Sequence, residues 1–394
     1  MTAHRPRGFT LVEIMVSLGI LSVAMSAAMY LLISSNGTSR RVRIVSDAQA
    51  TARLGIEALA ADLRAAGLGA ASGQVGVAPG AGAARRIPTI YSGPDVTIVE
   101  PGGQSVITNS LFIVTSDPAS VAPGSDAKGA QGVVVAASAG TPLTVVCYGS
   151  TGAAVDCSTS LVPSPLPPLI VGDFRNSVFL TPLTLGNPQG TPPTQQLDYA
   201  EKAGNAYSPD PKAPFGFVPG AFLFRARVVH WYLQQKVAGG PARLMRSFPV
   251  LSGTALTQAC NTTDAPFLDE TNDATGGSPA GMEMGAGPVE SIQFRFVTDA
   301  GATDDPSQFS MVKSISICDV AVPATLRAVR VQVVSRTLDS DQLTNDPQKR
   351  SLYATPAFEG TAPAAASSGA TLDAYPRRAF TMSVVPRNLQ GARL

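Results

Sequence analysis

Residues 8–39 read GFTLVEIMVSLGILSVAMSAAMYLLISSNGTS, and this stretch decides how the N-terminal part of the chain folds. In residues 9–39 the only charged side chain is that of Glu13, and residues 14–33 contain neither a charge nor a proline. A helix of about 20 apolar residues is long enough to cross a bilayer. The stretch therefore predicts a membrane-spanning helix that follows a short basic segment, residues 1–8.

Two other interpretations of this stretch stay open on the residues alone. A secretory signal peptide would be cleaved near the small side chains at residues 24–26, but its apolar core is usually shorter and has no carboxylate at its front edge. A plain membrane anchor would tolerate Glu13 as an interfacial charge. The arginines on the two sides of the span, with Arg40, Arg41 and Arg43 after it, do not decide its orientation.

A helical pattern continues beyond the apolar stretch. Apolar side chains recur every three or four positions along one stripe: Val45, Ala48, Ala52, Ile56, Leu59, Leu63 and Ala66. Charged residues, among them Asp62, fall mostly between them, and Gly67 is the residue expected just past a helix end. The sequence thus predicts one helix roughly 85 Å long. Residues 9–36 form its membrane half, and residues 37–66 form an amphipathic half that packs on a head.

Beyond the helix, the apolar pattern changes to the period of two that is typical of strands. Runs rich in strand-forming residues lie at 105–115, 132–148, 169–180, 221–237, 289–298, 311–322, 326–337 and 378–385. Ile292, Phe294 and Phe296 alternate with Gln293 and Arg295, as expected for a half-buried antiparallel strand. Long loops rich in Pro and Gly separate the runs, and the longest predicted ones include 181–220 and 338–377.

These patterns predict an α+β fold. A long N-terminal helix, whose first half spans a membrane, packs on a largely antiparallel β-sheet head with long loops. The head comprises residues 67–394.

The composition of the 394-residue chain argues against enzyme chemistry and nucleic-acid binding. Lys+Arg total 29 and Asp+Glu 28, so no polybasic surface for nucleic acid is indicated. His4 and His230 are the only histidines, too few for a zinc site built from several histidines. The sequence lacks a nucleophile elbow and a phosphate-binding loop. We therefore expect no catalytic residue, metal site or cofactor, and a packing role for His230 and Trp231.

Four cysteines fit an oxidising compartment. Cys147 and Cys157 flank a turn rich in Gly, Ser and Thr, which a local disulfide would staple. Cys260 and Cys318 would then pair across a long separation. Four cysteines allow three connectivities, so the pairing stays open.

The junction at the start of the apolar stretch, GFTLVEIMVSL at residues 8–18, resembles the class III signal of type IV pilins and type II secretion pseudopilins. The resemblance implies that prepilin peptidase cleaves between Gly8 and Phe9 and so removes residues 1–8 as a leader. It further implies that Phe9 is then N-methylated. The N-terminus would be cytoplasmic and the head periplasmic.

A physical argument, separate from the resemblance, also predicts a role for Glu13. An ionised carboxylate at the edge of a membrane is costly unless it is paired. Cleavage would create a positive amine on Phe9, and in a helical array the amine of a neighbouring subunit would neutralise the Glu13 carboxylate. Such a pair also fixes the register of adjacent helices. We therefore expect Glu13 to act in assembly, with a tolerated anchor charge as the alternative.

Two late segments resemble the PilW-like minor pilins, namely AVRVQVVSR at residues 328–336 and RAFTMSVVPRN at residues 378–388. The resemblance implies a minor pilin that primes or caps a type IV pilus and is no enzyme. A head of more than 300 residues would crowd a tightly wound fibre, which favours a rare subunit at or near the tip.

The partners that this resemblance implies are prepilin peptidase, other major and minor pilins, the inner-membrane assembly platform and a tip adhesin. The protein would first be a single-pass inner-membrane protein and then part of the pilus. The alternatives are a minor pseudopilin of a type II secretion system and a membrane-anchored periplasmic binding protein.

Overall fold

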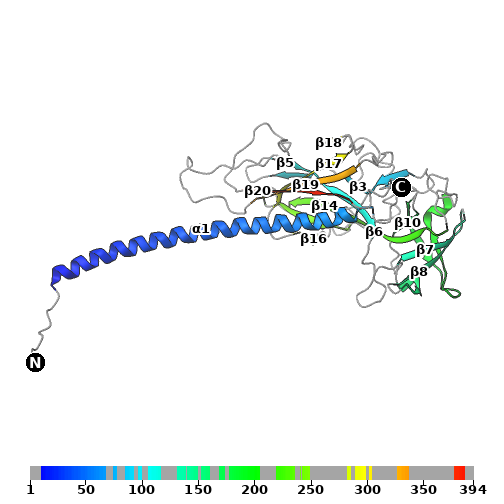
Figure 1. The fold of residues 1–394 in the computed structure, drawn as a ribbon, viewed down its shortest axis with the longest axis horizontal. Coiled ribbons are helices and arrows are strands. Elements are labelled where there is room, and N and C mark those ends of the chain that lie inside the picture. The colour runs from blue at the N-terminus through cyan, green and yellow to red at the C-terminus, as the bar shows by residue number, and fades with distance from the viewer. Residues whose placement is uncertain are drawn as a thin grey trace, which may run out of the picture.

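A computed structural model gives the fold of the chain (Figure 1). It describes residues 10–67, 74–77, 85–92, 96–99, 105–116, 131–138, 140–149, 152–159, 168–173, 177–204, 219–235, 240, 242–248, 282–284, 289–298, 301–303, 326–336 and 377–386. The strand predicted at residues 311–322 lies outside this set.

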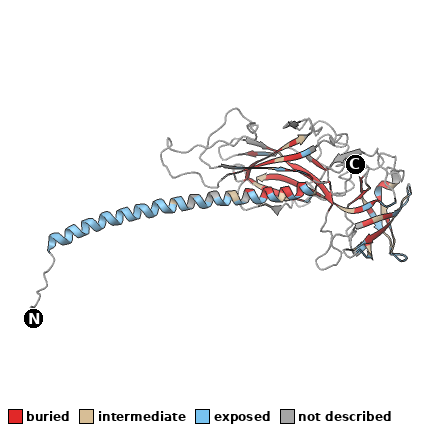
Figure 2. Ribbon diagram, viewed as in Figure 1, coloured by how far each residue is buried: buried red, intermediate tan, exposed pale blue. Residues whose placement is uncertain are grey.

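The N-terminal helix, α1 (Leu11–Ala65), is unbroken over 55 residues, as the sequence predicts. At 1.5 Å per residue it is about 82 Å long. Its first half projects away from the head and its second half lies along the head (Figure 1). Figure 2 shows the matching change in burial, from exposed on all sides to buried on one side. On the predicted stripe, Ala52, Ile56, Leu59 and Leu63 are buried.

The end of α1 is held by hydrogen bonds to strand β6 (Leu111–Ser116). The backbone amide of Gly67 donates to the carbonyl of Val114 over 3.0 Å, and the Thr115 hydroxyl donates to the carbonyl of Ala65 over 2.7 Å. Gly67 has a φ of 72°, in the left-handed region that glycine adopts without strain. The predicted glycine stop is therefore confirmed.

A four-stranded antiparallel sheet packs against the second half of α1. Its strands, in spatial order, are β18 (Gly301–Thr303), β17 (Val289–Thr298), β19 (Leu326–Arg336) and β20 (Arg377–Val384). Ile292, Phe294 and Phe296 of β17 lie in one core with Leu59 and Leu63 of α1. The alternation predicted for residues 289–298 is confirmed, and it places the apolar face of the sheet against the helix.

Strand β14 (Phe222–Gln235) connects two separate cores of the head. Its second half pairs with β6 and with β15 (Ala242–Ser247), and Val229, Trp231 and Leu233 enter the core beneath α1. Its first half pairs with β7 (Gln131–Ala136) and β10 (Leu169–Gly172), and Leu223 enters the second core.

The second core contains no described residue of α1. It lies at the end of the head that is far from the free end of the helix (Figure 1). We call it the distal core.

The remaining described strands complete the head. They are β1 (Gln74–Val77), β2 (Arg85–Pro88), β3 (Ile90–Ser92), β4 (Val96–Val99), β5 (Ser105–Thr108), β8 (Leu143–Tyr148), β9 (Ala154–Val155), β11 (Ser177–Leu180), β12 (Pro182–Leu185), β13 (Gln195–Tyr199) and β16 (Met282–Glu283). Short 3-10 helices are η1 (Cys157–Thr159) and η2 (Ala200–Gly204).

Apart from β4 and β5, which form a separate pair, these strands join β6, β7, β10, β14 and β15 in a branched 14-stranded sheet. The main path of this sheet is β12-β13-β8-β7-β14-β10-β11-β1-β2. Among the described pairings only β1 with β11 is parallel. The predicted α+β fold, with an apolar N-terminal helix before a largely antiparallel head, is confirmed.

The prediction of a loop at residues 181–220 is wrong for the first part of this range, because β12 and β13 lie there. The sequence of β12 is PLTL and that of β13 is QQLDY, so each has only a short apolar alternation, too short to predict a strand. Cross-strand pairing to β8 and burial of Leu197 and Tyr199 in the distal core hold them in place instead.

Gly55 allows α1 to approach the sheet closely. A Cβ atom at this position would lie 2.6 Å from Cδ2 of Leu244, a buried residue of β15. Real carbon atoms do not pack that closely, so a larger residue would displace Leu244. A glycine weakens a helix by about 1 kcal/mol relative to alanine, and here it provides room for the contact between helix and sheet.

Candidate assembly site on the N-terminal helix

Glu13 forms a capping box with Thr10 at the start of α1. The Thr10 backbone amide donates to Glu13 Oε2 over 2.9 Å, and the Thr10 hydroxyl donates to the same oxygen over 3.0 Å. In return the Glu13 amide donates to the Thr10 hydroxyl oxygen over 3.3 Å. A carboxylate here also complements the positive end of the helix dipole. Glu13 thus starts the helix within its own chain, a role that the sequence analysis missed.

The residues that follow make α1 able to cross a membrane. Within the described part of the chain, Leu11–Ser39 is one helical stretch of sufficient length and apolarity, with a mean hydropathy of 2.1. None of its most apolar window is buried in the head. Gly8 and Phe9, the predicted cleavage and methylation residues, lie outside the described residues.

Three serine hydroxyl groups within this span bond to the helix itself. Ser17 donates to the carbonyl of Glu13 over 2.6 Å, Ser22 to that of Gly19 over 2.8 Å, and Ser26 to that of Ser22 over 2.8 Å. A hydroxyl bonded to its own helix has little need of water, so it can enter lipid or a helix interface at low cost. These small side chains allow close contact with other helices.

The second half of α1 is locked to the head by a buried carboxylate. Trp231 Nε1 donates to Asp62 Oδ2 over 2.8 Å. Arg246 donates through Nε to the same oxygen over 2.7 Å and through Nη2 to Oδ1 over 2.6 Å. Asp62 is only 9% exposed, so these bonds replace the water that its charge would otherwise require. We call Asp62, Trp231 and Arg246 the helix lock.

Aromatic rings extend the helix lock toward the surface of the head. The guanidinium of Arg246 lies 5.9 Å from the Trp231 ring centroid and 4.5 Å from that of Phe248, and Arg227 lies 4.0 Å from the Phe248 ring. Such contacts hold a guanidinium in a fixed orientation. The sequence pattern places Asp62 on the polar side of the helix and predicts packing alone for Trp231. Both assignments miss the bond between them.

The four cysteines divide between described and undescribed parts of the chain. The structure joins Cys147 of β8 to Cys157 at the start of η1, with their Cα atoms 5.2 Å apart. Cys260 and Cys318 lie outside the described residues. Both joined cysteines are buried in the distal core, so the bridge ties the β8–β9 turn to it.

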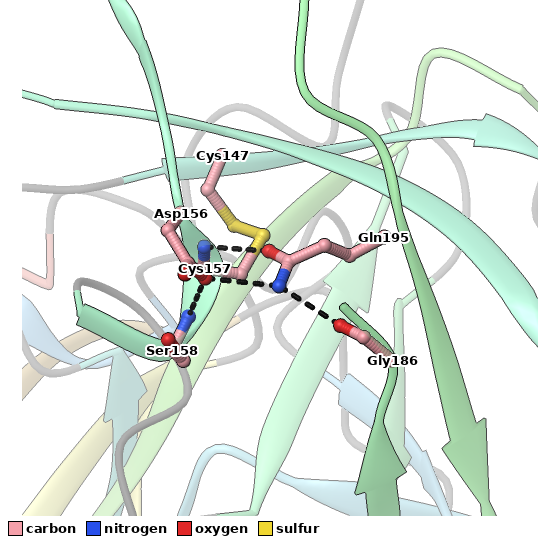
Figure 3. Close-up of a disulfide and its surroundings, with 6 residues drawn as sticks. All are labelled: Cys147, Asp156, Cys157, Ser158, Gly186 and Gln195. Atoms are coloured by element: carbon pink, nitrogen blue, oxygen red, sulfur yellow. Dashed lines mark hydrogen bonds between the residues drawn. A yellow bond between two sulfur atoms is a disulfide. The ribbon is translucent and has the colours of Figure 1, made fainter. Parts of the chain in front are cut away.

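Gln195 of β13 holds the segment around this disulfide (Figure 3). Its Oε1 accepts from the Cys157 backbone amide over 2.7 Å, and its Nε2 donates to Asp156 Oδ1 over 2.9 Å and to the Gly186 carbonyl over 3.0 Å. Burial opposes ionisation of Asp156, but the hydrogen bonds from Ser158 and Gln195 outweigh it and lower the pKa of this carboxyl. These polar contacts fix the segment around Cys157 to β13.

Glu201 of η2 is a buried carboxyl two residues after Tyr199, a residue of the distal core. It is 5% exposed, and its Oε1 and Oε2 accept from the Thr181 backbone amide over 3.1 and 3.0 Å. Burial raises the pKa of Glu201, and the bonds from Thr181 offset this only in part. Burial and the nearby Glu201 charge raise the pKa of Tyr199 to about 12.

The described residues hold no cluster of three or more His, Cys, Asp or Glu side chains that could bind a metal ion. His230 is buried in β14, with its ring stacked 3.9 Å from Phe112 and 4.6 Å from Tyr232. This agrees with the packing role predicted for it. The features with evident functional chemistry are thus the exposed half of α1 and its attachment to the head.

Comparison with known proteins gives two family matches. Residues 4–29 match the prokaryotic N-terminal methylation motif, and residues 255–388 match type IV pilus-assembly protein W. A solved type IV-like pilin from Thermus thermophilus aligns with 42% of this chain and 68% of its own, at 11% identity and a TM-score of 0.20. No curated protein is significantly similar to the chain.

The helix, the head and the methylation motif together define a class of α+β protein that carries an apolar N-terminal helix with this motif in front of a β-rich head. With the match over residues 255–388, the chain is similar to type IV pilin-like proteins: it carries a region that matches type IV pilus-assembly protein W and an N-terminal methylation motif. These matches imply prepilin processing and interaction with pilus components, a structural role.

Proposed function

We propose that the protein is a minor pilin that acts in the priming or tip complex of a type IV pilus. Prepilin peptidase cleaves it between Gly8 and Phe9, and Phe9 is then N-methylated. Before assembly it is a single-pass inner-membrane protein with a periplasmic head. Its partners are the peptidase, other pilins and the inner-membrane assembly platform, and a tip adhesin.

The observation that carries this proposal is the contrast between the two halves of α1. Residues 11–39 expose apolar side chains around the whole helix, whereas Ala52, Ile56 and Leu59 are buried against the head. Exposed apolar surface of this extent needs lipid or other helices to cover it. The head holds one end of the helix and leaves the other end exposed. Such a helix can anchor the protein in a membrane and later pack among other helices.

The size and architecture of the head support a rare subunit. The distal core contains no described residue of α1 and extends the head beyond the helix end. In a wound fibre each head must fit between its neighbours, and an extended head would obstruct them. A subunit at one end of the fibre has free space on one side. The match to type IV pilus-assembly protein W supports the pilus rather than a secretion machine.

The proposal is tested by counting pili on a wild-type strain, a gene deletion and the complemented deletion. Electron microscopy should show a large loss of pili in the deletion and recovery on complementation. Immunoblots of sheared pili should detect the protein at a small fraction of the major pilin. Normal pilus number in the deletion would contradict the proposal. If enzyme secretion into the medium fell at the same time, the pseudopilin alternative would replace it.

A further inference from the structure

Three arginines follow the apolar span of α1 within four residues: Arg40, Arg41 and Arg43. The span Leu11–Ser39 contains 29 residues, which is about 43 Å of helix. A bilayer with its headgroup layers is about 40–45 Å thick. A helix that fills the membrane with this span therefore brings the three arginines to the outer edge of the headgroup layer on the side of the head.

The residues before the arginines also agree with a position of the arginines at the outer edge of the headgroup layer. The apolar side chains end at Ile33, and residues 34–39 read SSNGTS. These six small, mostly polar residues extend about 9 Å along the axis. In a helix the Cα–Cβ bonds tilt toward the N-terminus, which here is toward the membrane. The long basic side chain of Arg43 therefore starts in the direction of the lipid phosphates.

The head does not cover the helix at Arg43. Arg43 is exposed, and the first described residue of α1 that is buried is Ala52, about 13 Å further along the axis. The only carboxylate between them belongs to Asp47. It lies four residues after Arg43, and a basic residue placed before an acidic one is the weaker order for a helical ion pair. One carboxylate against three guanidinium groups leaves an excess of positive charge.

We propose that Arg40, Arg41 and Arg43 bind the phosphate groups of anionic phospholipids in the membrane leaflet next to the head. Basic residues beside a membrane span attract anionic lipids, and a guanidinium binds a phosphate through two parallel hydrogen bonds. At 100° per residue the three positions lie within roughly 160° of the helix circumference. Lipid therefore occupies one side of the helix, and the other side stays open to a neighbouring subunit.

This lipid site gives the arginines a role that their sequence position alone does not explain. Arginines on the periplasmic side work against the orientation that the proposed function requires, because positive residues favour the cytoplasmic side. Lipid phosphates neutralise them there and fix the height of the helix in the membrane. The inference rests on the membrane anchor of the proposed function, and it adds the anionic phospholipid as a ligand.

The test measures lipids that stay bound to the full chain in detergent. Wild type and an R40Q/R41Q/R43Q variant are titrated with phosphatidylglycerol or phosphatidylcholine, and bound lipids are counted by native mass spectrometry. The matched control, R53Q/R64Q/R327Q, removes three exposed arginines away from the span. The single variant R43Q reports on the one arginine of the three whose exposure is described. Flotation with vesicles of either lipid measures membrane insertion of each protein.

Wild type and the control should retain phosphatidylglycerol in preference to phosphatidylcholine. Affinity should fall roughly fivefold for each arginine removed at positions 40, 41 and 43. Equal phosphatidylglycerol binding by all proteins that float would overturn this inference alone, as would an equal loss in the control. A wild-type chain that fails to float with either vesicle would overturn the membrane anchor, and with it both the proposed function and this inference.

Discussion

Asp62 of α1 and Arg246 of β15 form a two-point ion pair, with Nη2 and Oδ1 2.6 Å apart and Nε and Oδ2 2.7 Å apart. The two residues are 184 positions apart in the sequence. The same carboxylate accepts from Trp231, the only tryptophan in the chain. Asp62 is therefore the point at which the direction of the helix and the position of the head are fixed relative to each other.

We expect D62N to weaken the attachment of α1 and lower the free energy of unfolding by about 3 kcal/mol. Asparagine keeps the size of the side chain but leaves the Arg246 guanidinium without its counter-charge in a largely buried site. Urea unfolding of the full chain in detergent, followed by Trp231 fluorescence, measures the change. The matched control is E57Q, which removes an exposed carboxylate from the same helix and should change stability by less than about 0.5 kcal/mol. Equal stability of D62N and E57Q would show that the ion pair does not hold the helix.

The length and end of α1 could be predicted because their causes are local. The apolar spacing of Ile56, Leu59 and Leu63 and the glycine at position 67 are properties of neighbouring residues. The burial of Asp62 could not be predicted in this way, because Arg246 and Trp231 are far away in the sequence. The position of Asp62 beside Leu63, at the edge of the apolar stripe, was the one local indication that this carboxylate is buried.

For the head, too, the sequence predicted only those features whose causes are local. Ile292, Phe294 and Phe296 have the alternation of a half-buried strand, so their face was predictable. The polar strand β13 is held by pairing to β8 and by the contacts of Gln195, so its cause lies in residues that are distant in sequence. At the N-terminus, resemblance supplied the cleavage and methylation residues. The capping contact between Glu13 and Thr10 appeared only in the structure.

The mature protein should begin at Phe9 and carry one added methyl group. The match to the N-terminal methylation motif over residues 4–29 is the reason for this expectation. Intact-mass and N-terminal peptide mass spectrometry of the protein from its native membrane measure both changes. G8A should keep residues 1–8 attached, because the peptidase reads that glycine. A mature N-terminus near residue 27 would instead support a secretory signal peptide and remove the membrane half of α1.

E13Q separates the two roles of Glu13. A glutamine oxygen still accepts from the Thr10 amide, so the helix start is kept, but no charge remains to neutralise the Phe9 amine of a neighbour. We expect E13Q to be cleaved and inserted normally and to be absent from sheared pili, as measured by immunoblot.

T10A is the matched control for this experiment. It removes the hydroxyl that caps the Glu13 amide and costs about 1 kcal/mol of helix stability, but it keeps the carboxylate. T10A should enter pili. Normal recovery of E13Q in sheared pili would show that capping, rather than charge, is what Glu13 contributes.

Removal of the disulfide should loosen the distal core and leave the helix lock intact. A bridge that closes a loop of this size, with its cysteines 10 positions apart, contributes about 2–3 kcal/mol. In C147S/C157S, hydrogen exchange should become faster in β7 and β8 and stay unchanged in the second half of α1. Q195A, which leaves the bridge but removes its polar support, should give a smaller change in the same strands. Uniform loss of protection across α1 and the distal core would mean that the two cores do not unfold separately.

The buried carboxyl of Glu201 should make the stability of the head depend on pH. Because burial raises its pKa above the ordinary value of 4.5, the carboxyl stays protonated in the folded head at a pH where it is already ionised in the unfolded chain. Its favourable contribution is therefore fully present below pH 4.5 and is lost as the pH rises through the raised value. E201Q keeps an acceptor for the Thr181 amide and never ionises.

We thus expect E201Q to be more stable than wild type at pH 7, with a difference that shrinks toward pH 4, as measured by melting temperature across this range. D198N is the matched control, since Asp198 lies three residues away and pairs with Lys202 while both side chains are 26% exposed. The loss of such a pair changes stability by about 0–1 kcal/mol. If the difference between E201Q and wild type grew as the pH fell, hydrogen bonds from Thr181 rather than burial would govern this carboxyl.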